Sequence, residues 1–235
     1  REIKSFDLDK SQNFIERSRI IKLALPDFVN QGLSTMLRQY TEIFFLGAYF
    51  PATIVGIYEL GFFLPTMALA VIPHSTKNIF ISAFSKVYVA DKSSLGAMVS
   101  SAHKFLHSIV LPLSALGFFY SGQLIPLIYG DSMRDAGFVA SFYSILGAIS
   151  MISIPYAVAI VTKEKVANIL PLTIMQIIVN IIADYLLIPK HGINGAIAAI
   201  SITFIITYPV RLYVISRIIG GLFFPGLFIL KIFIL

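Results

Sequence analysis

The sequence contains no cysteine, and charged residues make up only 13 % of it. The lack of cysteine excludes disulfide bonds and thiolate metal sites. For the same reason, the sequence does not indicate whether the protein lies in a reducing or an oxidising compartment. Soluble domains carry about a quarter charged residues, whereas 57 % of this chain is hydrophobic and its mean hydropathy is +0.85. We therefore expect the lipid bilayer to be the solvent of most of the chain.

Sequence motifs of soluble catalysis are also missing. The chain has no nucleophile elbow, no phosphate-binding loop and no metal-hydrolase motif. His103 and His107 have the i, i+4 spacing of metal ligands, but no Glu or Asp lies near them in the sequence. We predict no metal, no cofactor and no enzymatic activity.

The length suits a bundle of membrane helices. A chain of 235 residues can form about six to seven spans of ~20 residues each. We predict an all-α polytopic membrane helical bundle in which residues 20–220 form one unit of about six transmembrane helices. Pro26 is expected to divide the first apolar run, and a helix is expected to continue after the second span until Asp91. The spans are expected at residues 27–47, 54–72, 105–120, 139–161, 169–188 and 196–215.

Both ends of the sequence differ from this apolar unit. Residues 1–19 are polar and of mixed charge, which predicts a cytoplasmic linker. Residues 221–235 start a further hydrophobic helix, and the chain stops inside the apolar run LFILKIFIL. The first residue is Arg, and no signal peptide is recognisable. We therefore expect the sequence to be a fragment of a longer membrane protein.

The basic residues are concentrated in the predicted loops. The formal net charge is +6, and most Lys and Arg residues fall in short linkers between apolar runs, which is the positive-inside pattern of membrane proteins. If the first linker is cytoplasmic, the outer loops hold only Arg134 and Lys190. We expect both ends of the six-helix unit to face the cytoplasm, and we expect no nucleic-acid partner.

A polar stripe runs along the first apolar run. The residues that share this helix face are Asp27, Asn30, Gln31, Ser34, Arg38, Thr41 and Glu42. Hydrocarbon cannot satisfy such groups, so we expect the stripe to face a bundle interior or a water-filled cavity. Arg38 and Glu42 are four residues apart and can form a structural ion pair; alternatively, the stripe is a cavity wall that meets a charged solute. We favour the cavity wall, because an ion pair alone would not need the row of polar neighbours.

Other polar residues lie on later spans. The fifth span carries a second stripe, made of Thr173, Gln176, Asn180 and Asp184. Its amides either bond a neighbouring helix or line the cavity, and Asp184, about a turn from the outer interface, either reaches water or binds an ion. The candidates for ion coupling are Glu42, Glu59 and Asp184, although Glu59 can equally be a solvated carboxylate at the outer interface. Arg211 on the sixth span is expected to extend to the cytoplasmic surface or to line the cavity.

Several segments together resemble one known family. The segment LALPDFVNQGLSTMLRQYTEIFFLGAYFPATIVGIYEL is similar to the opening of the second six-helix lobe in polysaccharide and oligosaccharide-lipid flippases of the multidrug/oligosaccharidyl-lipid/polysaccharide exporter superfamily. Glu42, Leu46-Gly47 and Val55-Gly56-Ile57-Tyr58 match its pattern. The later segments LIPLIYG and NIIADYLLIPKHGINGAIAA resemble the family's turns after the third and fifth helices of a lobe. Many relatives have Asp-Arg where this chain has Glu42-Ile43, and Asn where it has Asp184.

The resemblance implies one lobe of a two-lobe transporter, with a missing amino-terminal lobe of the same chain as its partner. The implied function is translocation of a lipid-linked oligosaccharide, with alternating access through a partly hydrated cavity in the cell membrane. Arg38 would contact the phosphate of the headgroup, because its guanidinium suits phosphate geometry. A cation-coupled multidrug or metabolite exporter of the same superfamily is the second hypothesis, and a membrane-embedded glycosyl- or acyltransferase is the third.

Overall fold

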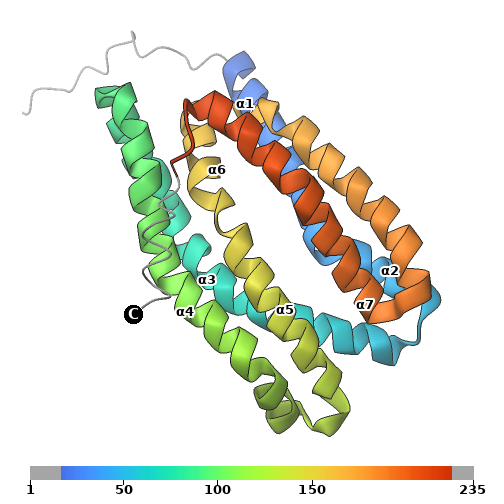
Figure 1. Cartoon of the computed structure of the whole chain (residues 1–235). Helices are drawn as coiled ribbons and strands as arrows, with labels where there is room; N and C mark the ends of the chain where they lie inside the picture. Colours follow the sequence, from blue (N-terminus) through green and yellow to red (C-terminus); the bar gives the residue numbers. More distant parts are fainter. Residues whose placement is uncertain (1–16, 224–235) are drawn as a thin grey trace, which may run out of the picture.

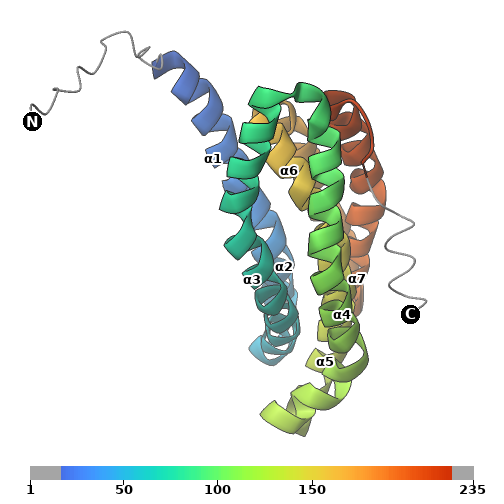
Figure 2. The same ribbon diagram turned by 90° about the vertical axis from the view of Figure 1, so that its left-hand side faces the viewer.

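The structure, a computed structural model, describes residues 17–223, apart from the side chains of residues 17–20, 22, 23, 37–39 and 74. These residues form an all-helical bundle whose long helices run along roughly one axis (Figures 1 and 2). The expected linker and the expected truncated helix lie mostly outside the described residues. The prediction of an all-α membrane bundle is confirmed at this level.

The first apolar run forms two helices, α1 (Arg17–Gln39) and α2 (Thr41–Tyr49). The expected division at Pro26 is wrong, because α1 continues through this proline and the helix changes direction at Tyr40, where φ is −125°. A proline removes one backbone donor and bends a helix, but membrane helices tolerate it where neighbouring groups compensate. The polar residues of the first run are therefore divided between two helices.

The next two helices are long. Helix α3 covers Ala52–Ala90, and α4 covers Leu95–Tyr129. The short 3-10 turn η1 (Lys92–Ser94) between them is capped by Asp91, whose side chain accepts hydrogen bonds from the Ser93 amide and from the hydroxyls of Ser93 and Ser94. These bonds hold the pKa of the exposed Asp91 carboxyl below its usual value. The predicted helix break at Asp91 is confirmed.

Three further helices follow in the described part of the second half of the chain. After η2 (Asp131–Met133), α5 (Arg134–Ser150) and α6 (Ser153–Thr162) follow each other with a small offset. After η3 (Val166–Asn168), α7 covers Leu170–Ile219, and at Gly192 (φ +54°, ψ −128°) it turns back on itself. The two arms of α7 run antiparallel beside each other (Figure 1). Predicted turns at Gly130 and Gly192 are confirmed, and both glycines adopt the positive φ that other residues rarely adopt.

Four helical stretches of the described residues are long and apolar enough to cross a membrane: residues 52–90, 92–129, 131–162 and 166–219. The predicted number of six spans is therefore not confirmed. Two features explain the difference. The polar helix α1 is not among these stretches, and the last stretch contains both arms of α7.

Helices α3, α4 and α5 pack through glycines, and we call them the glycine-packed group. A Cβ atom on Gly61 of α3 would lie 2.5 Å from both the Ala136 carbonyl oxygen and the Val139 Cβ of α5. A Cβ on Gly137 of α5 would lie 2.8 Å from the Cα of Gly122 in α4. Real Cβ atoms cannot come so close, so these helices approach each other only because the side chains are absent.

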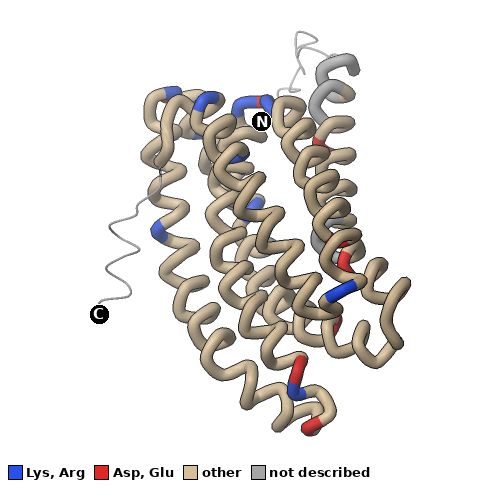
Figure 3. Tube along the Cα trace, turned by 45° about the vertical axis from the view of Figure 1, so that its right-hand side comes forward, with Lys and Arg blue, Asp and Glu red and all other residues tan. Residues whose placement is uncertain are grey.

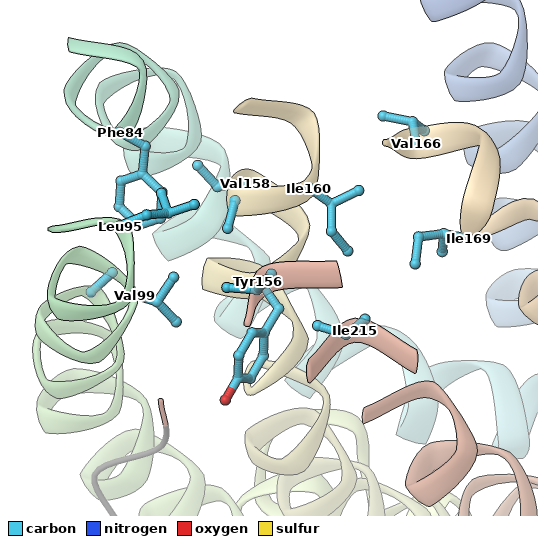
Figure 4. Close-up of a cluster of buried hydrophobic side chains, with 12 residues drawn as sticks. Phe84, Leu95, Val99, Tyr156, Val158, Ile160, Val166, Ile169 and Ile215 are labelled. Carbon is cyan, nitrogen blue, oxygen red and sulfur yellow. The ribbon is translucent and has the colours of Figure 1, made fainter. Parts of the chain in front are cut away.

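An apolar cluster closes one end of the bundle. Phe84 of α3, Leu95 and Val99 of α4, and Tyr156 of α6 are buried there beside Ile215 of α7 (Figure 4). The cluster also includes Val166 and Ile169, which lie where η3 leads into α7. It therefore joins the glycine-packed group to α7 near the loops after α3 and α6.

Charges are divided between the two ends of the bundle. Lys and Arg residues gather toward the end that holds the loops after α3 and α6, which we call the basic end (Figure 3). Lys92, Lys163 and Lys165 belong to these loops. The opposite end, at the turn between α4 and α5, carries an exposed ion pair between Arg134 and Asp131. This is the asymmetry that the positive-inside pattern of the sequence predicted.

Candidate functional site

A cluster of hydrogen-bonded polar side chains joins α2 to the first arm of α7. The Asn180 Nδ2 atom lies 2.6 Å from Asp184 Oδ2, 3.3 Å from Glu42 Oε1 and 3.1 Å from Thr41 Oγ1. The Thr41 hydroxyl in turn donates to Glu42 Oε2 at 2.9 Å. An amide has only two hydrogens, so it serves at most two of its three acceptors at once.

This carboxylate cluster, made of Thr41, Glu42, Asn180 and Asp184, is deeply buried. Asn180 and Asp184 are 0 % exposed, and Glu42 is 3 % exposed. Asn180 Oδ1 and Asp184 Oδ1 are buried without a hydrogen-bond partner among the described residues. Buried oxygens of this kind usually have a donor, a water or an ion beside them, so the cluster has capacity for one more ligand.

Two carboxyl groups that share one amide cannot both carry a negative charge cheaply in a low-dielectric interior. A proton on one carboxyl group, or a bound cation between them, removes this repulsion. Carboxylate, amide and hydroxyl oxygens are also the ligands that hard cations prefer. The arrangement can therefore take up and release a proton or a small cation.

A pair of buried tyrosines lies one helical turn from the cluster. The hydroxyls of Tyr58 in α3 and Tyr143 in α5 are 2.5 Å apart. Both tyrosines pack in an apolar cluster with Leu46 and Ile188, which follow Glu42 and Asp184 by four residues. This pair could not be predicted from the sequence, because single tyrosines in apolar helices give no periodic signal.

Toward the basic end, a second set of polar contacts surrounds a small cavity of about 60 Å³. Asp27 and Asn30 of α1, Ser153 of α6 and Arg211 in the second arm of α7 contribute to its wall. Asn30 Oδ1 accepts a hydrogen bond of 2.5 Å from the Thr173 hydroxyl, which is fully buried. A volume of 60 Å³ holds about two water molecules.

Two more side-chain bonds belong to this end. Gln31 Nε2 donates to Asp27 Oδ2 at 2.6 Å, and Arg211 Nη1 donates to Gln176 Oε1 at 3.3 Å between the two arms of α7. We call the polar residues along which α1 and α2 face the first arm of α7 the polar seam. Its members are Asn30, Thr41 and Glu42 on one side, and Thr173, Gln176, Asn180 and Asp184 on the other.

The structure brings together many, but not all, of the predicted site residues. Asn30 and Glu42 contact α7, and Asp27 and Ser34 are half-buried. Gln31 is exposed, as are Phe28 and Phe44 on the opposite face of the stripe. Asn30 and Glu42 thus face protein, as the solvent argument for the stripe requires, whereas Gln31 of the same stripe is exposed.

Other predicted residues lie apart from the seam or outside what is described. Glu59 is exposed on α3, and no hydrogen bond among the described residues links it to the carboxylate cluster. The side chain of Arg38 lies outside the described residues, so its predicted pairing with Glu42 stays a prediction.

For two residues the structure separates the alternatives that the sequence left open. Asp184 does not reach water, because its side chain is 0 % exposed and lies within the carboxylate cluster. Arg211 is half-buried, donates to Gln176 and contributes to the cavity wall, which agrees with the alternative that it lines a cavity. Hydropathy gave the depth of these residues but not the neighbours that surround them.

The described residues contain no group of three or more His, Cys, Asp or Glu side chains that could hold a metal ion. His103 and His107 are buried at 0 % and 2 % exposure, and the ring of His103 packs edge-on against Tyr156. Both rings are therefore buried where α4 packs against its neighbours.

Comparison with known proteins places the chain in a family. A family model described as "Polysaccharide biosynthesis protein" matches residues 12–137, which are 126 of the 235 residues. No curated protein matches the chain, and no solved structure does. The match covers α1 to α4 and the start of α5, including the whole α1 and α2 side of the polar seam. The chain is thus a multi-pass membrane protein that belongs to this family of polysaccharide biosynthesis proteins.

Proposed function

We propose that the chain forms a six-helix lobe of a flippase that moves a lipid-linked oligosaccharide across the cell membrane by alternating access. The single observation that carries the proposal is a polar seam inside an apolar bundle whose family acts in polysaccharide biosynthesis. A passive membrane anchor does not need buried carboxylates and amides, because each of them costs free energy in hydrocarbon. A transporter needs such groups to bind its substrate or coupling ion.

In this proposal the second lobe is a separate part of the same protein, and both ends of the present lobe face the cytoplasm. The basic end of the bundle supports this orientation through the positive-inside rule. The stripe residues of α1 that are exposed or half-buried in the lobe would line the central passage. Among them, Arg38 would bind the phosphate groups of the headgroup, because a guanidinium forms bidentate bonds with phosphate.

The test uses the intact protein in a strain that lacks the chromosomal copy. We expect the deletion strain to lose surface glycan and to accumulate the lipid-linked precursor, and the unaltered protein to restore export. Arg38→Ala should insert normally but reduce export at least about tenfold, the effect of losing one charge-assisted contact. Arg134→Ala, which removes an exposed arginine of the opposite end, is the matched control. Normal export with Arg38→Ala would contradict the assigned role.

A cation-coupled exporter of drugs or metabolites is the second candidate, and the carboxylate cluster favours it. Glu42→Gln and Asp184→Asn keep the shape of the cluster but remove its ability to exchange a proton or cation. Each variant should insert normally and lose most of its cation-driven transport, whichever substrate is carried. Altered drug tolerance with intact surface glycan in the deletion strain would favour the exporter over the flippase.

A further inference from the structure

The polar seam connects two features that the proposed function leaves unconnected. The cavity beside Asp27 and Arg211 lies near η3, at the basic end, whereas the carboxylate cluster lies deeper along α7. Between them, the polar residues Thr173, Gln176, Asn180 and Asp184 recur at intervals of three or four residues on one face of α7. A continuous polar line in an apolar bundle thus runs from the cavity to the carboxylates.

We propose that this line is the entry route for a monovalent cation, a proton or Na⁺, from the basic end to the carboxylate cluster. The inference rests on the coupling role proposed for Glu42 and Asp184. Asp27 lies at the cavity and supplies a negative charge at the entrance. Asn180 Oδ1 and Asp184 Oδ1 are buried without a hydrogen-bond partner among the described residues. A proton would bind the Asp184 carboxylate, and Na⁺ would be held by both oxygens.

Two side-chain bonds close the route in this structure. The Thr173 hydroxyl donates to Asn30 across the gap between α7 and α1, and Arg211 donates to Gln176 between the arms of α7. Both bonds lie between the cavity and Asn180 in the order of residues along α7. Opening the route requires both bonds to break: a movement of α1 away from α7 breaks the first, and a rotation of the Arg211 side chain breaks the second. Neither change disturbs the glycine-packed group.

The chain is suited to a direct test because it contains no cysteine. The silver ion is a monovalent cation that reacts with thiols, so a single introduced cysteine reports whether cations reach its position. Thr173→Cys places the reporter on the route, and Ser114→Cys is the matched control, a buried polar residue of α4 within the glycine-packed group. Thiols that no water reaches stay protonated and react slowly.

The experiment treats membrane vesicles of both orientations, containing the intact protein, with Ag⁺, and then labels the remaining thiols after denaturation. We expect Thr173→Cys to react at least about tenfold faster than Ser114→Cys, and first in vesicles that expose the basic end to Ag⁺. Adding Asp27→Asn should slow the reaction at Thr173→Cys a few-fold, because the entrance loses the charge that concentrates cations. Na⁺ that slows the reaction identifies Na⁺ as the ligand; a rate independent of Na⁺ identifies the proton.

Equal, slow reaction at Thr173→Cys and Ser114→Cys would overturn the route. If Asp27→Asn leaves the rate of the Ag⁺ reaction at Thr173→Cys unchanged, the entrance is not at Asp27. The measurement does not depend on oligosaccharide transport, so a failed flippase test with rapid reaction at Thr173→Cys rejects the substrate and keeps the cation route.

Discussion

The two sides of this bundle hold their helices together by different means. In the glycine-packed group, α3, α4 and α5 meet through backbone atoms at Gly61 and Gly137, where no side chain fits between the helices. In the polar seam, α1 and α2 meet α7 through hydrogen bonds of side chains such as Asn30, Glu42 and Asn180. Close packing has one favourable distance, whereas side-chain hydrogen bonds can exchange partners or accept water. We therefore expect the glycine-packed group to be rigid and the polar seam to be able to open.

This difference matches the requirement of alternating access. A transporter needs elements that move and elements that do not, and movements between rigid groups are built from interfaces with two discrete arrangements. The apolar cluster at Phe84 and Ile215 ties α7 to the rigid side at the basic end. Movement of α1 against α7 leaves this cluster in place, because no described side chain of α1 belongs to it.

The largest expected effect is at the centre of the polar seam. Asn180→Leu removes the amide donor that serves Glu42 and Asp184, and it should lower the free energy of unfolding by about 3 kcal/mol, since each buried acceptor without a donor costs about 1–3 kcal/mol. Thermal unfolding of the purified protein in detergent measures the loss. Ile181→Ala, at the exposed neighbouring residue, is the control and should have little effect. If Asn180→Leu is as stable as the unaltered protein, the seam does not hold α2 to α7.

A smaller effect is expected in the glycine-packed group. Gly61→Ala places a methyl group against the Ala136 carbonyl oxygen and Val139, and should destabilise the protein by about 2 kcal/mol through overpacking. Gly56→Ala, on the same helix, has no atom within 4 Å of the new Cβ and should be neutral or slightly stabilising. The same unfolding measurement compares the two. Equal stability of both variants would show that α3 and α5 are not in close contact.

The smallest effect is expected from a single bond of the seam. Thr173→Val keeps the shape of the side chain but removes the hydroxyl that bonds Asn30, and should cost about 0.6 kcal/mol, the average for such bonds in membrane proteins. Hydrogen exchange at the backbone of α1 should increase while exchange in α5 stays unchanged. Uniform changes over both helices would mean that the two sides of the bundle open together.

Several features were predictable from the sequence because they depend on local chemistry. Gly130 and Gly192 occur in turns, and Asp91 followed by two serines ends a helix, as the sequence predicted. The polar stripe was predictable because hydrocarbon excludes the charges of α1 whatever their partners are. The position of the first helix break was not predictable, since Pro26 allowed the helix to continue and the change of direction came at Tyr40.

The partners across the bundle could not be predicted. Periodicity placed Asn180 and Asp184 on one face of a helix, but it did not show that Glu42 lies opposite them, because the separation of 138 residues carries no local signal. The same reason explains why the hydroxyl contact between Tyr58 and Tyr143, 85 residues apart, was missed. The sequence left two positions open for Arg211, because it does not show that Gln176 is its neighbour.

The sequence by itself determined that the chain is a membrane bundle, that its polar residues form stripes on helix faces, and where several of its turns occur. These properties follow from the solvent, since apolar surface and unsatisfied polar groups are separated wherever the chain folds. Only the tertiary structure decided which stripes meet, which glycines allow close contact and which carboxylates share an amide. Those outcomes depend on how helices far apart in the sequence pack, and packing joins residues that have no relation along the chain.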